Sequence, residues 1–211
     1  SMDINVRLIQ NASEVKSSED AIEQLKKAMS DKYKLTEVSE KWANVHAVCF
    51  LPGHNLLDVA SIEMISRIAH EEDDVYFKPH PITNTDALNM IAKRVGWNKV
   101  IPKDVSGFEL LKQCNEVYTS TASEMAISGT AYGARVYNIT NFFNEANGVY
   151  HPISRVLFRK HAKESVKAAQ KALSNMINCK WSGLIFPWQD DVEERLKAFY
   201  DKSIEMKNMY R

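Results

Sequence analysis

Apolar residues follow two alternating patterns along this chain. Continuous apolar runs, such as residues 45–51 and 135–139, are separated by stretches like residues 56–72, in which apolar side chains return every third or fourth position. Continuous runs are typical of strands buried on both faces, and the other spacing is typical of amphipathic helices. Over residues 45–139 the patterns predict about five strands with a helix between each pair.

The limits of the expected elements come from caps and turns as well as from the apolar pattern. Serine and acidic residues begin the first helix, and Gly96 ends the helix that starts near residue 84. We expect strands at residues 4–10, 45–51, 73–81, 99–104, 116–123 and 135–139. We expect helices at residues 17–33, 56–72, 84–96, 106–114, 123–133, 164–177 and 190–210.

Strands and helices that alternate in this way favour a parallel sheet with helices on both faces, a Rossmann-like α/β fold. We divide the chain into three parts. Residues 1–44 form an N-terminal extension of one strand and one helix, and residues 45–150 form the Rossmann-like core. Residues 151–211 supply C-terminal helices that we expect to pack back on that core.

Composition narrows the class of protein. The 211 residues are 45% apolar and 26% charged, and 27 basic residues balance 27 acidic ones. No field of one sign therefore favours nucleic acid or membrane as a partner of the whole surface. The three cysteines are widely spaced and fit reduced thiols better than disulfides or a zinc site. We expect a cytoplasmic protein, with a peripheral association with membrane left open.

The stretch "YTSTASE" places four hydroxyl groups between an apolar strand and the start of a helix. Ligands of an open parallel sheet bind outside the carboxyl ends of its strands. Hydroxyls and helix N–H groups there form an anion site, which the helix dipole strengthens. The alternative is an ordinary N-cap, because serine and threonine are preferred where backbone donors lack partners.

The second candidate is "KPHP" at residues 78–81. Prolines on both sides of His80 remove backbone freedom and aim the histidine out of the sheet end. Lys78 lies two residues earlier, on the same side of an extended chain. A lysine and a histidine that converge at a strand end suit a phosphate. The alternative is a rigid loop with an exposed histidine.

These two stretches together resemble a known protein family. "FKPHP", followed some 40 residues later by "VYTSTASEMAISGTAYGARVYNI", resembles the C-terminal half of GT-B glycosyltransferases. It is most similar to the families with an HP motif and a later Ser/Thr motif: bacterial sialyltransferases, polysialyltransferases and capsule-type Kdo transferases. The similarity spans residues 45–145, about half of the chain. It implies transfer of a sugar from a nucleotide-sugar, cytidine-based in those families.

The resemblance also implies roles for individual residues. His80 would stabilise the leaving phosphate, and Lys78 would lie beside it. The phosphate cradle and the ribose acceptor would come from the later motif: Ser120, Thr121, Ser123 and Glu124. Gly53 would allow close backbone approach to the donor, and Pro102 or its neighbours would lie by the base. No metal or other cofactor is implied, since no paired carboxylates resemble a metal-binding DxD.

A GT-B enzyme has a second Rossmann-like domain with the acceptor site and the catalytic base, and residues 1–44 are too few for one. The chain is then a fragment, or the partner of a subunit that supplies the acceptor half, or a nucleotide-binding module with another task. Candidates for the base are His54, Asp58 and His151. The implied partners are a nucleotide-sugar, a glycan or other acceptor, and a partner subunit or a second copy, with nucleic acid as acceptor left open.

Two features of the last 60 residues have alternative interpretations. Residues 151–180 hold seven basic residues and one acid, which fits either an acceptor-docking surface or a solvated helix face. Trp181, Phe186 and Trp188 fit either a stacking platform or, as we favour, packing of the C-terminal helices. A sugar-nucleotide epimerase is a further function class, and it also needs a second domain.

Overall fold

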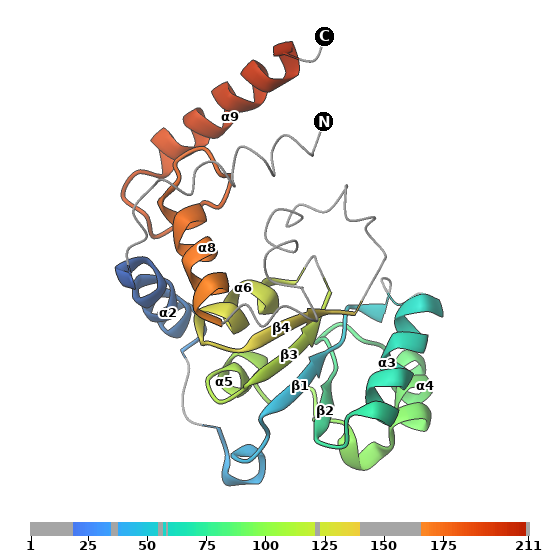
Figure 1. Ribbon diagram of the computed structural model, residues 1–211. Helices are drawn as coiled ribbons and strands as arrows, with labels where there is room; N and C mark the ends of the chain where they lie inside the picture. The colour runs from blue at the N-terminus through green and yellow to red at the C-terminus, as the bar shows by residue number, and fades with distance from the viewer. Residues whose placement is uncertain are drawn as a thin grey trace.

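The prediction of a Rossmann-like α/β fold is confirmed. The computed structural model describes residues 19–34, 38–54, 57, 59–120, 123–139 and 166–209. Within these residues, four parallel strands form one sheet in the order β2-β1-β3-β4 (Figure 1). The strands are β1 (Ala47–Phe50), β2 (Val75–Lys78), β3 (Glu116–Thr119) and β4 (Arg135–Asn138).

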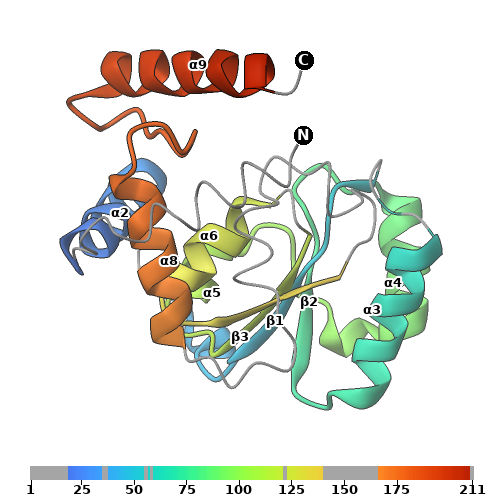
Figure 2. The same ribbon diagram turned by 45° about the horizontal axis from the view of Figure 1, so that its top comes forward.

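Helices cover both faces of this sheet (Figures 1 and 2). Helices α3 and α4 lie on one face, α5 and α6 lie on the other, and α2 and α8 pack against the outer side of α6. The described helices are α2 (Glu19–Tyr33), α3 (Val59–Glu71), α4 (Thr85–Val95), α5 (Gly107–Leu111), α6 (Glu124–Ala131), α8 (Val166–Asn178) and α9 (Val192–Met209). Short 3-10 helices span Glu40–Trp42 and Trp97–Lys99.

The apolar run at the first strand is continuous because both faces of the sheet are covered. Val48 and Phe50 pack with α5 and α6, whereas Cys49 and Leu51 pack with α3. Successive side chains of a strand point to opposite faces, so a central strand with two buried faces has no polar positions. All four side chains are buried.

Helix α6 lies between the sheet and the outer helices, which holds its N-terminus in place. Ala126 packs toward the sheet, and Ile127 and Ala131 pack against α2 and α8. The helix is therefore buried nearly all round, as its run of apolar and small residues from Ala126 to Ala131 requires.

The prediction of a strand at residues 99–104 is wrong. Residues 97–99 form a 3-10 helix, and Val100 makes a single parallel bridge to Phe77 on the outer edge of β2. The pairing ends at once because Pro102 has no N–H to donate to a ladder. The edge position leaves β1 flanked by β2 and β3, so the polar ends of these strands lie along one edge of the sheet.

The C-terminal helices make different contacts. Helix α8 joins α2 and α6 in one apolar cluster, which Phe186 also contacts. Helix α9 stands away from the sheet (Figure 2) and is anchored by buried Arg195, whose guanidinium donates to the carbonyl of Ile177 at 2.7 Å and pairs with Asp191 at 2.7 Å. Phe186 stacks on Trp188 with ring centroids 4.6 Å apart.

Several predictions concern residues other than the described ones. The strand at residues 4–10, the division at residue 150 and most of the basic segment 151–180 lie outside them. Cys49, Cys114 and Cys179 are buried and free. Among the described helices, none combines the length and the apolar character that a membrane crossing needs.

Candidate functional site

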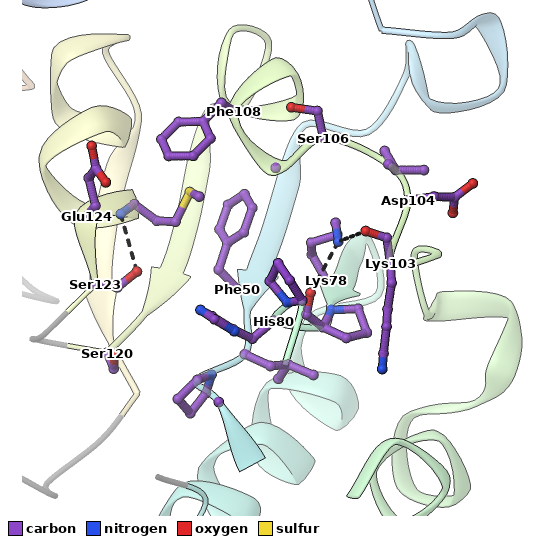
Figure 3. A pocket seen from close by; sticks show the side chains of 18 of the residues that line it. Phe50, Lys78, His80, Lys103, Asp104, Ser106, Phe108, Ser120, Ser123 and Glu124 are labelled. Carbon is purple, nitrogen blue, oxygen red and sulfur yellow. Dashed lines mark hydrogen bonds between the residues drawn. The ribbon is translucent and has the colours of Figure 1, made fainter. Parts of the chain in front are cut away.

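A pocket of about 480 Å³ lies at the carboxyl ends of β1, β2 and β3. It is bounded by the turns after these strands, the loop before α5 and the start of α6 (Figure 3), and also by Tyr33 at the end of α2. The chain leaves β1 toward β2 on one side and returns as β3 on the other. A parallel sheet binds ligands at this switch point, where the turns diverge and leave a crevice.

Lys78 is the buried cation of this pocket. Its side chain leaves the last residue of β2 and is only 4% exposed. The ammonium donates to two backbone carbonyls, those of Pro79 at 3.1 Å and Lys103 at 3.2 Å (Figure 3). Among the described residues, no carboxylate forms an ion pair with it.

Burial lowers the pKa of Lys78 to about 8, an effect that the carboxylate of Asp104 partly opposes and the charge of Lys103 adds to. Removing an ammonium from water without an opposite charge destabilises its protonated form. An anion in the pocket would supply that charge and the acceptor for the remaining N–H.

His80 lines the same pocket in a defined tautomer. Its Nδ1 accepts the backbone N–H of Ile82 at 3.2 Å, so the neutral ring carries its proton on Nε2. Burial and the charge of Lys78 lower the pKa of His80, and the ring is therefore mostly neutral at pH 7. His80 is therefore a neutral donor.

His54 has the opposite tautomer. Its Nδ1 lies 2.8 Å from the carbonyl oxygen of Ile82, which can only accept, so this nitrogen carries the proton. The neutral ring then has its lone pair on Nε2. His54 is exposed and lies next to Gly53, but it is not one of the residues that line the pocket.

The Ser/Thr segment contributes two side chains to the pocket wall, Ser120 and Ser123. Ser123 is the N-cap of α6, and its hydroxyl accepts the backbone N–H of Met125 at 3.2 Å. The cap interpretation therefore holds for Ser123, and the cap stands at the pocket with the positive end of the helix dipole. Thr121 lies outside the described residues.

We expect the substitution Ser123→Ala to lower the free energy of unfolding by about 0.5–2 kcal/mol, because it removes the N-cap of α6. Urea denaturation of both chains measures the change. Ser203→Ala is the control, because the Ser203 hydroxyl bonds a carbonyl within exposed α9 and caps no helix. Equal stability of Ser123→Ala and the wild type would contradict the capping role.

Glu124 is already engaged by α2. It accepts a hydrogen bond from the Tyr33 hydroxyl at 2.9 Å and pairs with Lys32 at 3.4 Å. Both partners come from the N-terminal extension, so the pocket is not built by residues 45–150 alone. Burial raises the pKa of the Tyr33 hydroxyl, which keeps it a donor to Glu124.

Aromatic rings form the wall between the two polar groups of the pocket. Phe50 and Phe108 lie between Glu124 on one side and Lys78 on the other (Figure 3). The Tyr33 ring stacks on Phe108, with centroids 3.7 Å apart and an interplanar angle of 15°. The pocket thus combines a cationic end with flat apolar surface, on which a planar or sugar ring can rest.

The structure brings most of the predicted site residues together. Gly53, Lys78, His80, Ser120, Ser123 and Glu124 all line the pocket. Pro102 does not, although its neighbours Lys103 and Asp104 do. Asp58 and His151, both proposed as bases, lie outside the described residues or side chains.

Sequence reasoning missed Tyr33, Phe50 and Phe108. Phe50 lies in a buried run and is expected in the core, and Phe108 belongs to a short helix whose facing could not be read. Tyr33 reaches the site from 91 residues away in sequence. An aromatic residue at the end of an amphipathic helix is the single local signal, and it is a weak one.

Neither a metal site nor a comparison with known proteins indicates a function. Within the part of the chain that the structure describes, no three His, Cys, Asp or Glu side chains gather as a metal site. No protein-family model, curated protein or solved structure matches this chain.

Proposed function

We propose that this chain is the donor-binding part of a glycosyltransferase, which binds a nucleotide-sugar in the pocket at the ends of β1, β2 and β3. The donor is cytidine-activated, as in the families that the HP and Ser/Thr motifs resemble. The proposal rests mainly on Lys78. Its ammonium is buried, lines the pocket and forms no ion pair with a described carboxylate.

The buried ammonium favours an anionic ligand for an energetic reason. A buried charge without a counter-charge destabilises the fold, and a phosphate that enters the pocket offsets this cost. The same anion meets the Nε2–H of His80, while the N-terminus of α6 lies beyond the aromatic rings (Figure 3) and favours negative charge at the other end of the ligand. Cation, neutral donor and helix dipole together suit an anionic ligand better than a neutral one.

The remaining groups suit the rest of a nucleotide-sugar. Phe50, Phe108 and Tyr33 offer flat apolar surface for the base or the sugar. Glu124 accepts hydroxyl hydrogen bonds once the contact with Tyr33 is exchanged or shared. Gly53 lies in the turn after β1, where the missing side chain allows backbone to approach the donor.

In the transfer step, the acceptor oxygen forms a bond to the anomeric carbon while the bond from that carbon to the phosphate oxygen breaks. The phosphate leaves with the electron pair, and Lys78 and His80 stabilise its added charge. The acceptor proton passes to a base. His54 is our candidate, because its Nε2 holds a lone pair and the preceding residue, Gly53, lines the pocket.

The alternative is a non-catalytic module that binds a nucleotide or phosphosugar for a partner subunit. The position of His54 favours this alternative, because the ring does not line the pocket. Release of the nucleotide from a nucleotide-sugar by the pure chain, and its loss in His54→Ala, would exclude the module. Tight binding without turnover would support it.

The first test is calorimetric titration of the chain with CMP, CDP, UDP and GDP. We expect a cytidine nucleotide to bind, and His80→Ala to weaken its binding by about 1.5–3 kcal/mol, the scale of a hydrogen bond to a charged group. His70→Ala is the matched control, because His70 is exposed in the last turn of α3. If no nucleotide binds, or if the two variants bind equally, the proposal fails.

A further inference from the structure

Helix α9 carries an apolar stripe that the described part of the chain leaves exposed. Leu196, Tyr200 and Ile204 are 54%, 64% and 40% exposed, and Phe199, at the edge of the stripe, is 44% exposed and lies against Gly183. Their spacing of three and four residues puts them on one side of the helix. The opposite edge of α9 holds the contacts to the chain, through buried Arg195 and Met206.

Charges flank this stripe in a self-complementary order. Glu193 lies seven residues before Tyr200, Lys207 lies seven residues after it, and both fall on the same side of the helix as the stripe. Leu196 and Ile204 lie four residues before and after Tyr200. A reversal of the helix about Tyr200 therefore exchanges acid with base and one aliphatic residue with the other.

We propose that α9 pairs with α9 of a second copy of this chain, antiparallel, about a two-fold axis at Tyr200. Leu196 then contacts the partner's Ile204, and Glu193 meets the partner's Lys207. Each contact occurs twice, as a two-fold interface requires. In a parallel pair Glu193 would face another Glu193, and like charges would oppose association.

The size of the apolar stripe on α9 determines how tightly the dimer is expected to associate. Eighteen residues make a helix about 27 Å long, and its stripe has three large apolar side chains, with Phe199 at the edge. Such an interface belongs with the small ones, which form weak and transient complexes. We expect a dimer whose dissociation constant is on the order of micromolar, so that its population changes with concentration.

Sedimentation velocity over a range of concentrations is the first measurement, with and without charge exchange. Glu193→Lys and Lys207→Glu should each weaken the dimer roughly three- to tenfold, because each turns two attractive pairs into repulsive ones. The double variant restores both pairs with exchanged sign, and should return the dissociation constant to near the wild-type value. Tyr200→Glu should abolish the dimer, since it places two carboxylates at the axis.

Cross-linking then tests the axis. The three native cysteines are buried, so an introduced surface cysteine is the reactive one. Tyr200→Cys chains should form an interchain disulfide under mild oxidation, whereas Glu205→Cys chains, with the change on the opposite side of α9, should not. A monomer at every concentration would overturn the proposal, as would failure of the double variant to recover. Both results are independent of nucleotide binding.

Discussion

Lys78→Met should weaken binding of the phosphate-bearing ligand by about 2–4 kcal/mol, which is roughly 30- to 900-fold in the dissociation constant. The substitution removes the buried charge that opposes the phosphate. Methionine has a similar length and fills the same space without a charge. Isothermal titration with the nucleotide that binds most tightly to the wild type measures the loss.

The same substitution should stabilise the ligand-free protein. At pH 7 the wild type holds a protonated ammonium in a buried position, and methionine removes this cost, by about 1–2 kcal/mol. Opposite changes in affinity and stability distinguish a binding residue from a structural one, since loss of a structural residue lowers both. Thermal denaturation without ligand measures the second change.

Lys93→Met is the control for both measurements. Lys93 is exposed on α4, away from the residues that line the pocket. Its substitution should leave affinity unchanged and stability within about 0.5 kcal/mol of the wild type. If Lys78→Met binds ligand as tightly as this control, Lys78 does not contact the anion.

The affinity of the wild type for the same ligand should fall steeply above pH 8. Because the pKa of Lys78 is about 8 in the empty pocket, the protonated form that binds an anion decreases about tenfold for each further pH unit. We therefore expect affinity about tenfold weaker at pH 9, and about 100-fold weaker at pH 10, than at pH 7. Titrations at these three pH values measure the effect.

Neighbouring groups do not reproduce this profile. Burial raises the pKa of the Tyr33 hydroxyl, and the hydrogen bond with Tyr33 raises that of Lys32, so both keep their protons in this range. The pKa of His80 is lowered, so its ring has already lost its proton. Lys78→Met should therefore bind weakly but with little dependence on pH between 7 and 9. An equally steep fall in that variant would assign the titration to another group.

Stability should change with pH in the opposite sense to affinity. Between pH 8 and about 10.5, the unfolded chain binds more protons at Lys78 than the folded chain does, because the pKa is lowered in the fold. The contribution of Lys78 to the free energy of unfolding then rises with pH across this window. The advantage of Lys78→Met over the wild type should be largest below pH 8 and vanish near pH 10.5.

The general layout of the fold can be predicted from local sequence patterns. Continuous apolar runs predict strands, three- and four-residue spacing predicts helices, and their alternation predicts parallel pairing. The prediction fails at residues 99–104, because a strand needs a partner along its whole length. Val100 reaches β2, but Pro102 ends the ladder, so a sequence that looks like a strand remains a single bridge.

The candidate site was likewise predicted only in part from the sequence. Polar residues at the ends of parallel strands meet at one edge of the sheet, which is why Lys78, His80 and Ser123 could be grouped from sequence. Sequence could not predict that Lys78 is buried without a carboxylate partner. Its burial depends on how the loop before α5 folds over the end of β2.

The sequence by itself therefore determined the α/β class, the polar strand ends and the cap of α6, because each depends on neighbours along the chain. Only the tertiary structure decided which tautomer His54 adopts, since its ring bonds the carbonyl of Ile82, 28 residues away in sequence. It also decided that Tyr33 closes the pocket against Glu124. That contact joins residues far apart in sequence, and it exists only because α2 packs on α6.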